Sequence, residues 1–296
     1  MPLLAFVGFG EAAQAFVEGW VDAPPARLVG YDCKTEAAQT RDAKRAEFAA
    51  RGVECADNLG QALVDADYVI SVVTADQSLP VAQAAAVLIR PGVTFFDCNS
   101  VSPASKQAAH AAITSAGGIY VDVAVAAPVR PALLNVPLLV SADDERAAVQ
   151  RLTALGFNAR PIPGGVGRAS AIKMIRSIMI KGIEALTAEC VLSAYAAGVE
   201  EEILASLDSS FPGFDWKSRA DYNLDRMIVH GRRRAAEMVE SSRTAAQLGL
   251  GGAMAAATAD WQQRIGDLDL PLPTDLDAKA TAVLSALAAS VGKTAP

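Results

Sequence analysis

The chain has 296 residues, of which 52% are hydrophobic and 20% are charged, so it is long enough for one large domain or two ordinary ones. A net charge of −7 argues against general binding to nucleic acids or anionic membranes, because both require a basic surface. The N-terminal residues lack a signal-peptide pattern, the cysteines are scattered, and there are only two histidines. We therefore expect a cytoplasmic protein in a reducing compartment, with no metal site.

Short β-rich runs alternate with alanine-rich helical stretches in the first half of the chain. The runs that we predict as strands are residues 3–8, 27–32, 68–73, 93–98, 119–125 and 136–142. Helical segments such as 11–20 and 35–50 lie between the earlier runs. Strands that alternate with helices form βαβ units, so we expect a doubly wound α/β domain with a parallel sheet.

The second half of the chain has the pattern of helices only. It follows the Pro- and Gly-rich stretch 159–165, and its first predicted helix, from about Gly167, is about 30 residues long, well above the usual ~11–12. A helix of that length suits a spine between domains or an oligomer interface. We predict that the α/β domain covers residues 1–163 and that an all-helical domain covers residues 164–296.

The first predicted strand ends in GFGEAA, where Gly8, Gly10 and Ala13 have the G-x-G-x-x-G/A spacing of a dinucleotide-binding turn. The glycines allow a tight turn and a close approach of the backbone to a pyrophosphate at the start of the next helix. The loop that we predict to contact the cofactor consists of Gly8, Phe9, Gly10, Glu11 and Ala12.

Asp32 follows the second strand at the distance expected of a ribose-binding carboxylate, which would repel a 2′-phosphate. This favours NAD over NADP, although the nearby Lys34 could tolerate a phosphate and Asp32 could instead cap the next helix. Val73 and Thr74 end the strand at 68–73, so we expect them to line the cofactor crevice; Thr74 could equally be a helix cap.

Candidate substrate ligands follow two later strands. Asn99 and Ser100 could bind a carboxylate or hydroxyl group beside the nicotinamide, or could form a turn and a helix cap. The loop of small residues at Ala126 could bring backbone amides near a ligand, and a plain turn explains it equally well.

Lys173 lies on a polar stripe of the long helix with Ser170 and Ser177, which is typical of a solvated helix face. The GGVG leader nevertheless places it at the domain junction, facing the predicted cleft. A lysine partly shielded there would have its pKa lowered toward neutrality and could act as a general base toward an alcohol. Spacing alone leaves both interpretations open.

Four motifs in order, GFGEAA, DCNSVSP, YVDVAVAAP and GGVGRASAIKMIRS, resemble those of the β-hydroxyacid dehydrogenases, which include 3-hydroxyisobutyrate and 6-phosphogluconate dehydrogenases. The resemblance covers about two-thirds of the chain. It implies a Rossmann-type domain followed by an all-helical domain, NAD or NADP as cofactor, and a homodimer formed through the helical domain. It also implies that Lys173 is the catalytic lysine, that Ser100 is a substrate-binding hydroxyl, with Asp97 and Pro103 framing its motif, and that Asp32 discriminates between cofactors.

The chain also departs from the family pattern. Ser177 stands where the family has asparagine, and Ala126, Ala127 and Pro128 replace a Ser-Gly-Gly loop, so the substrate is in doubt. The segment VHGRRRAAEMVE resembles a less characterised branch. Its His230 shares a helix face with Arg233 or Arg234, and these residues could clamp a carboxylate or phosphate of the substrate. Alternatively, the arginines could pair with nearby acids such as Asp225 and Glu237.

We predict an NAD(P)-dependent oxidoreductase that transfers a hydride between the nicotinamide and the hydroxyl-bearing carbon of a small β-hydroxy acid or related carbonyl compound, with Lys173 as general acid and base. We expect this substrate to carry a carboxylate. The predicted substrate contacts are Asn99, Ser100, Ala126, Ser177, His230 and Arg233. The alternatives are an imine reductase-like enzyme, against which Lys173 counts, and a dinucleotide-binding protein that has lost catalysis.

Overall fold

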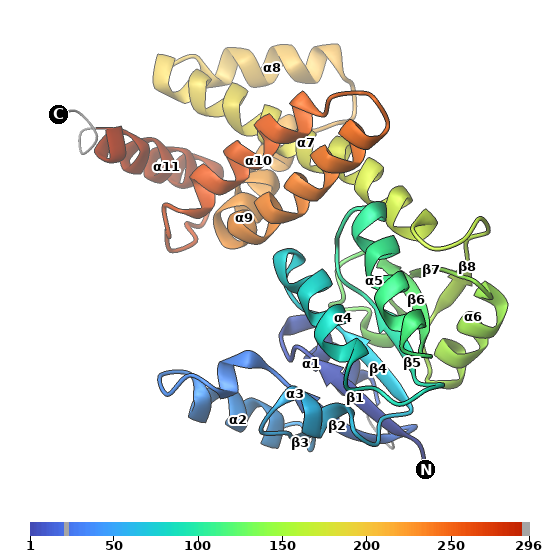
Figure 1. Cartoon of the computed structure of the whole chain (residues 1–296). Helices are drawn as coiled ribbons and strands as arrows, with labels where there is room; N and C mark the ends of the chain where they lie inside the picture. Colours follow the sequence, from blue (N-terminus) through green and yellow to red (C-terminus); the bar gives the residue numbers. More distant parts are fainter. Residues whose placement is uncertain (21–23, 292–296) are drawn as a thin grey trace. The chain divides into compact units, whose positions relative to one another are not determined.

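The computed structural model of the chain describes residues 1–20 and 24–291. They form two compact units: a sheet unit, Met1–Met174, and a helical unit that begins at Ile175 (Figure 1). None of the helices in the described ranges is long and apolar enough to cross a membrane.

Within the described residues, eight strands form one sheet in the order β3-β2-β1-β4-β5-β6-β7-β8. Their bounds are β1 Leu3–Val7, β2 Arg27–Tyr31, β3 Glu54–Cys55, β4 Tyr68–Ser71, β5 Thr94–Asp97, β6 Ile119–Val125, β7 Leu138–Ala142 and β8 Ala159–Pro161. All six predicted strands are confirmed. The two that sequence did not predict, β3 and β8, are two and three residues long, too short to show a hydrophobic period.

The sheet is parallel, as predicted, except where β6 pairs with β7 in antiparallel register. A parallel pairing needs a crossover connection, usually a helix. The connection from β6 to β7 contains only the short 3₁₀ helix η3, Leu133–Asn135, so the chain returns in the opposite direction.

Among the residues that the structure describes, six α-helices cover the sheet: α1 Glu11–Gly19, α2 Arg41–Ala49, α3 Leu59–Leu63, α4 Ser78–Ala86, α5 Pro103–Ser115 and α6 Glu145–Ala154 (Figure 1). Successive strand residues point to opposite faces, so Phe95 and Phe96 belong to two different hydrophobic clusters and both are fully buried. The helix predicted over 35–50 is shorter than expected, because the 3₁₀ helix η1, Cys33–Thr35, and a turn precede α2.

The helices of the second half are α7 Arg168–Ala197, α8 Glu200–Ser210, α9 Trp216–Gln247, α10 Ala253–Gly266 and α11 Leu276–Val291. The predicted length of α7 is confirmed, since it has 30 residues. The first turns of α7 belong to the sheet unit, so the units divide within this helix, between Met174 and Ile175. That point lies further along the chain than the boundary we predict from sequence at residue 163.

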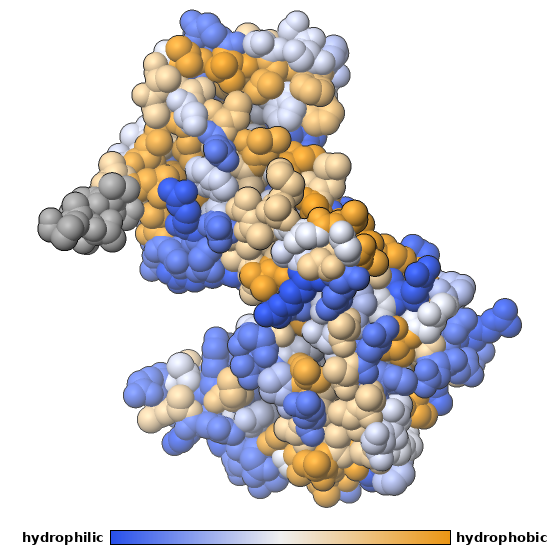
Figure 2. All heavy atoms as spheres, turned by 45° about the horizontal axis from the view of Figure 1, so that its top comes forward, coloured by the Kyte–Doolittle hydropathy of each residue, from blue (hydrophilic) through white to orange (hydrophobic). Residues whose placement is uncertain are grey.

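Helix α7 buries several polar side chains and exposes large apolar ones. Ser177, Lys181 and Glu184 are at most 6% exposed, whereas Ile175 is 48% and Leu186 is 65% exposed. Figure 2 shows such hydrophobic side chains, in orange, on the surface of the helical unit. The interpretation of the polar stripe as a solvated helix face is therefore wrong, because Ser170 and Ser177 are buried and Lys173 is half-buried.

Candidate active site

The glycine loop between β1 and α1 has the backbone geometry that a phosphate group requires. Gly8 has φ +86°, and a Cβ atom there would lie 2.6 Å from the carbonyl oxygen of Val72, so only glycine fits. A Cβ built on Gly10 would meet no heavy atom within 4 Å. Gly10 is the N-cap of α1, and in the part of the chain that the structure describes no side chain caps this helix, so no side chain competes with a phosphate at its N-terminus.

Phe9 contributes only its backbone to this loop. Its ring is fully buried and stacks on Phe48 with centroids 3.9 Å apart. Ala13, which the sequence motif places against the strand, is also fully buried. Glu11, in contrast, is exposed in the first turn of α1. Its carboxylate has the same sign of charge as the phosphates of a dinucleotide that would bind at this helix N-terminus.

Asp32 makes the helix cap that the sequence left as an alternative. Its Oδ1 accepts a hydrogen bond from the backbone N–H of Lys34 at 3.0 Å, and its Oδ2 accepts one from the N–H of Phe9 at 2.9 Å. A carboxylate has about four lone-pair sites, so acceptor capacity for a ribose hydroxyl remains. The cap and the predicted ribose contact are therefore compatible.

Lys44, on α2, is a neighbour of Asp32 that sequence reasoning missed. Its Nζ lies 4.0 Å from Asp32 Oδ2 and 2.6 Å from Glu47, and it donates to the carbonyl oxygen of Phe9 at 3.2 Å. The residue is only 6% exposed. A lysine in a polar helix normally lies in water, so nothing in the local sequence indicated this position.

The structure gives Asn99 a role in joining two loops. Its Oδ1 accepts from the backbone N–H of Val73 at 2.7 Å, and its Nδ2 donates to Ser71 at 2.9 Å, with the residue 3% exposed. These contacts fix the ends of β4 and β5 to each other. Val73 is half-buried at this edge, and the exposed Thr74 occupies the N-cap position of the 3₁₀ helix η2, Ala75–Gln77.

Lys173 and Ser100 lie in direct contact. The Nζ of Lys173 donates to the Oγ of Ser100 at 2.5 Å, and both side chains are half-buried within the sheet unit. The two residues are 73 positions apart in sequence and come from α7 and from the loop after β5. An amine and a hydroxyl in contact at the carboxyl edge of a parallel sheet can share the proton of a bound alcohol.

A group of buried charged residues, Asp97, Lys106 and Asp122, forms what we call the sheet-edge ion cluster. Asp97 is three residues before Ser100, and Asp122 accepts a hydrogen bond from Ser170, three residues before Lys173. Lys106 Nζ is 2.8 Å from Asp97 Oδ1 and 3.5 Å from Asp122 Oδ1, and all three side chains are fully buried. Burial disfavours the ammonium ion, but Asp97 and Asp122 outweigh that cost and hold the pKa of Lys106 above its usual value. The sequence signal for this cluster is a single charged residue, Asp122, inside the apolar strand IYVDVAV.

The other predicted substrate contacts have partners of their own. The backbone N–H of Ala126 donates to the carbonyl oxygen of Pro137 at 2.9 Å and so extends the β6–β7 pairing. Ser177 is buried in the helical unit, where its Oγ accepts from Lys181 at 3.1 Å.

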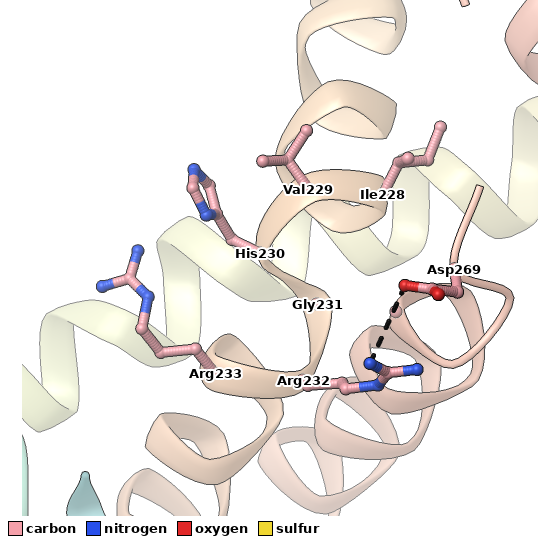
Figure 3. Close-up of a pocket in the computed structure, with 8 residues that line it drawn as sticks. Ile228, Val229, His230, Gly231, Arg232, Arg233 and Asp269 are labelled. Atoms are coloured by element: carbon pink, nitrogen blue, oxygen red, sulfur yellow. Dashed lines mark ion pairs between the residues drawn. The ribbon is translucent and has the colours of Figure 1, made fainter. Parts of the chain in front are cut away.

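Figure 3 shows His230 and Arg233 on one side of α9 and Arg232 on the other, facing Asp269. They line a hollow of about 310 Å³ in the helical unit. Arg233 is 3.5 Å from Glu237, which is one of the acidic partners considered from sequence. The predicted sharing of one face by His230 and Arg233 agrees with this view, whereas Arg234, the alternative to Arg233, is buried and forms an ion pair with Glu184.

The sequence-family model called NAD binding domain of 6-phosphogluconate dehydrogenase matches residues 5–155, which is more than half of the chain. The chain belongs to this family. Membership indicates a nicotinamide dinucleotide as cofactor, which fits the open glycine loop and Asp32, and it supports a dinucleotide-dependent oxidoreductase. Residues 194–265 match a second model, a domain of unknown function called DUF1932.

Solved structures of similar proteins agree with this assignment. A conserved hypothetical protein from Sinorhizobium meliloti 1021 is 37% identical, with 97% of each chain covered and a TM-score of 0.73. The conserved protein MTH1747 is 27% identical over 90% of this chain and 97% of its own, with a TM-score of 0.66, and is described as structurally similar to 3-hydroxyacid dehydrogenases. The 3-hydroxyisobutyrate dehydrogenase of Mycobacterium tuberculosis, solved with L-serine, is 17% identical over 96% and 99% of the two chains, with a TM-score of 0.71, and so shares the fold.

Proposed function

We propose that the protein is an NAD-dependent dehydrogenase of small β-hydroxy acids, with Lys173 as general acid and base. The observation that carries this proposal is the 2.5 Å contact between Lys173 Nζ and Ser100 Oγ. The glycine loop and Asp32 would hold the cofactor, whose nicotinamide ring accepts a hydride when it is bound.

In this proposal Ser100 orients the substrate hydroxyl and Lys173 takes its proton. A neutral amine at Nζ accepts the proton as the hydroxyl-bearing carbon is oxidised to a carbonyl group, and the resulting ammonium ion returns the proton in the reverse reaction. The substrate carboxylate is the group that distinguishes this class of alcohols from others. The half-buried Ser100 hydroxyl in contact with Lys173 favours an alcohol over an imine as substrate, because an imine has no hydroxyl proton to remove.

Replacement of Lys173 by alanine tests the mechanism. We expect Lys173→Ala to lower kcat by roughly 10²–10⁴-fold, the usual contribution of general acid–base catalysis, and to leave NADH binding intact. The probes are 3-hydroxyisobutyrate, 3-hydroxypropionate, L-serine and 6-phosphogluconate, each with NAD and with NADP. Lys217→Ala, at an exposed position on α9, is the matched control and should keep full turnover. Full turnover in Lys173→Ala would disprove the mechanism.

The preference for NAD rests on Asp32. Its carboxylate would repel a 2′-phosphate, although the ammonium group of Lys44 at 4.0 Å reduces that repulsion. We expect NADH to bind more tightly than NADPH, and Asp32→Ser to reduce the difference. Fluorescence titration with both cofactors measures it, and tighter binding of NADPH to the unmodified protein would contradict this role of Asp32.

We also propose that the protein is a homodimer that pairs the exposed apolar face of α7. Ile175, Met179 and Leu186 recur at helical spacing on this face and are 48%, 66% and 65% exposed. Analytical ultracentrifugation should show a dimer, and Met179→Glu combined with Leu186→Glu should yield a monomer. A monomeric unmodified protein would contradict the proposal.

A further inference from the structure

The first turn of α7 is held by side chains from the sheet. Asp122 Oδ2 accepts hydrogen bonds from the backbone N–H groups of Gly167 and Ser170, both at 3.1 Å, and its Oδ1 accepts one from Ser170 Oγ at 2.6 Å. Ser141, on β7, accepts from the N–H of Ala169 at 3.1 Å and donates to Asp122 at 2.9 Å. These amides would otherwise lack partners at the helix start, and the negative charge of Asp122 faces the positive end of the helix dipole.

The loop that carries Ser100 is held by the other carboxylate of the cluster. Asp97 Oδ1 accepts from the backbone N–H of Asn99 at 3.0 Å, one residue before Ser100. Its Oδ2 accepts from the hydroxyl of Tyr120 at 2.7 Å. Burial, together with Asp97, raises the pKa of Tyr120 well above its usual value, so this hydroxyl keeps its proton and remains a donor.

Lys106 connects the two carboxylates, and through them the two backbone segments. Ser170 is three residues before Lys173, and positions three apart share a helix face, so the anchored turn is the one from which Lys173 projects. Both carboxylates lie within 3.5 Å of Lys106 Nζ, and without this ammonium ion the two buried negative charges would repel each other.

We infer that Asp122, with Lys106 and Asp97, is a positioning residue for the reaction: it fixes the first turn of α7 so that Lys173 Nζ meets Ser100 Oγ. This inference rests on the function proposed above for Lys173. It assigns no contact with the substrate to Asp122, whose side chain is fully buried. Asp122 acts only through the placement of Lys173.

Asp122→Asn tests this assignment because it keeps the shape of the side chain but replaces one acceptor oxygen by a donor. We expect kcat on 3-hydroxyisobutyrate to fall by about 10²-fold, as for a misplacement of about 1 Å, while KM and NADH binding change little. In the Lys173→Ala background the same substitution should change kcat by less than about 2-fold, because the residue that it positions is gone. An equal loss in both backgrounds, or no loss in either, would overturn the inference.

A second readout does not depend on turnover. Reductive ¹³C-methylation labels lysine amines, and the resonance of Lys173 is identified by its loss in Lys173→Ala. We expect this resonance to move in Asp122→Asn and to stay in place in Thr94→Val, a control at the opposite end of β5 that alters a buried hydroxyl outside the cluster. An unmoved resonance in Asp122→Asn would refute positioning. A moved resonance with full turnover in Lys173→Ala would refute the proposed mechanism instead.

If Asp122→Asn does not fold, Ser170→Ala takes its place. It removes one donor to Asp122, the Oγ at 2.6 Å, and leaves the carboxylate and its ion pair with Lys106 unchanged. We expect the same pattern at a smaller scale: a several-fold loss of kcat that disappears in the Lys173→Ala background. A loss that persists in that background would overturn the inference as well.

Discussion

Two clusters of buried charges stabilise the two units, and they are built differently. In the helical unit Lys181 and Glu184 on α7 face Glu237 and Arg234 on α9; we call these four residues the helical ion cluster. Lys181 is 2.9 Å from Glu237, and Arg234 forms an ion pair with Glu184, which also accepts from Gln262 at 2.9 Å. Each carboxylate there faces a cationic side chain from the neighbouring helix. In the sheet-edge ion cluster, two carboxylates share one lysine.

The difference in charge balance determines which parts of the chain each cluster fixes in place. Because Asp97 and Asp122 share Lys106, acceptor capacity remains for other donors. Besides side-chain hydroxyls, these donors include the peptide N–H groups of Asn99, Gly167 and Ser170. The helical ion cluster joins side chain to side chain and so fixes one helix against another. The sheet-edge ion cluster fixes backbone segments beside Lys173 and Ser100. We therefore expect damage to the first to lower stability, and damage to the second to lower turnover as well.

The largest effect on stability is expected from Glu184→Ala. It leaves the guanidinium of Arg234, 7% exposed, without its carboxylate, and loss of one partner of a buried ion pair costs about 3–5 kcal/mol of unfolding free energy. Urea denaturation followed by circular dichroism measures this loss. Turnover per folded molecule should stay within about 2-fold of the unmodified protein, since the sheet unit is intact. A loss of turnover as large as that expected for Asp122→Asn would remove the distinction between the clusters.

Tyr120→Phe should have a smaller effect and sharpens the comparison within the sheet unit. It removes the donor 2.7 Å from Asp97 Oδ2 but leaves Lys106, Asn99 and the whole Asp122 anchor in place. A hydrogen bond to a charged group contributes about 1.5–3 kcal/mol, so the unfolding free energy should fall by that amount. The kcat should change by only a few-fold. A fall in kcat of about 10²-fold would show that the Asp97 side of the cluster matters for positioning as much as Asp122.

The sequence predicted the parts of the molecule that follow from local pattern. The strands that carry β-branched runs, the glycine loop at Gly8 and the length of α7 are all visible in spacing and periodicity. The strands β3 and β8 were missed because they are too short for a period, and their place depends on their neighbours in the sheet. The antiparallel direction of β7 was also missed, because it depends on whether a crossover helix lies between β6 and β7.

The site residues that belong to a sequence motif could be predicted, whereas those whose role depends on burial in the folded chain could not. Lys173 and Ser100 were candidates from their motifs, and the structure places them in contact. Asn99 was a candidate for a ligand contact. In the structure its side-chain amide instead forms hydrogen bonds with Val73 and Ser71, which are 26 and 28 residues away in the chain. Lys106 and Lys44 have the local sequence of solvated helix residues, and only tertiary packing shows that they are buried.

Alkylation of cysteines tests whether a mutation in the helical unit changes the sheet unit. We expect Glu184→Ala to have no effect on the sheet unit. Burial raises the pKa of the Cys98 thiol to about 12, whereas Cys33 is exposed. At pH 8 a thiol with that pKa is about 10⁻⁴ ionised, and only the thiolate reacts, so iodoacetamide should modify Cys33 long before Cys98. In Glu184→Ala the protection of Cys98 should be unchanged, because the broken ion pair lies in the other unit. Mass spectrometry of labelled peptides follows both sites. Loss of protection at Cys98 in this variant would show that the units open together, and the stability of the sheet-edge ion cluster would then depend on the helical ion cluster.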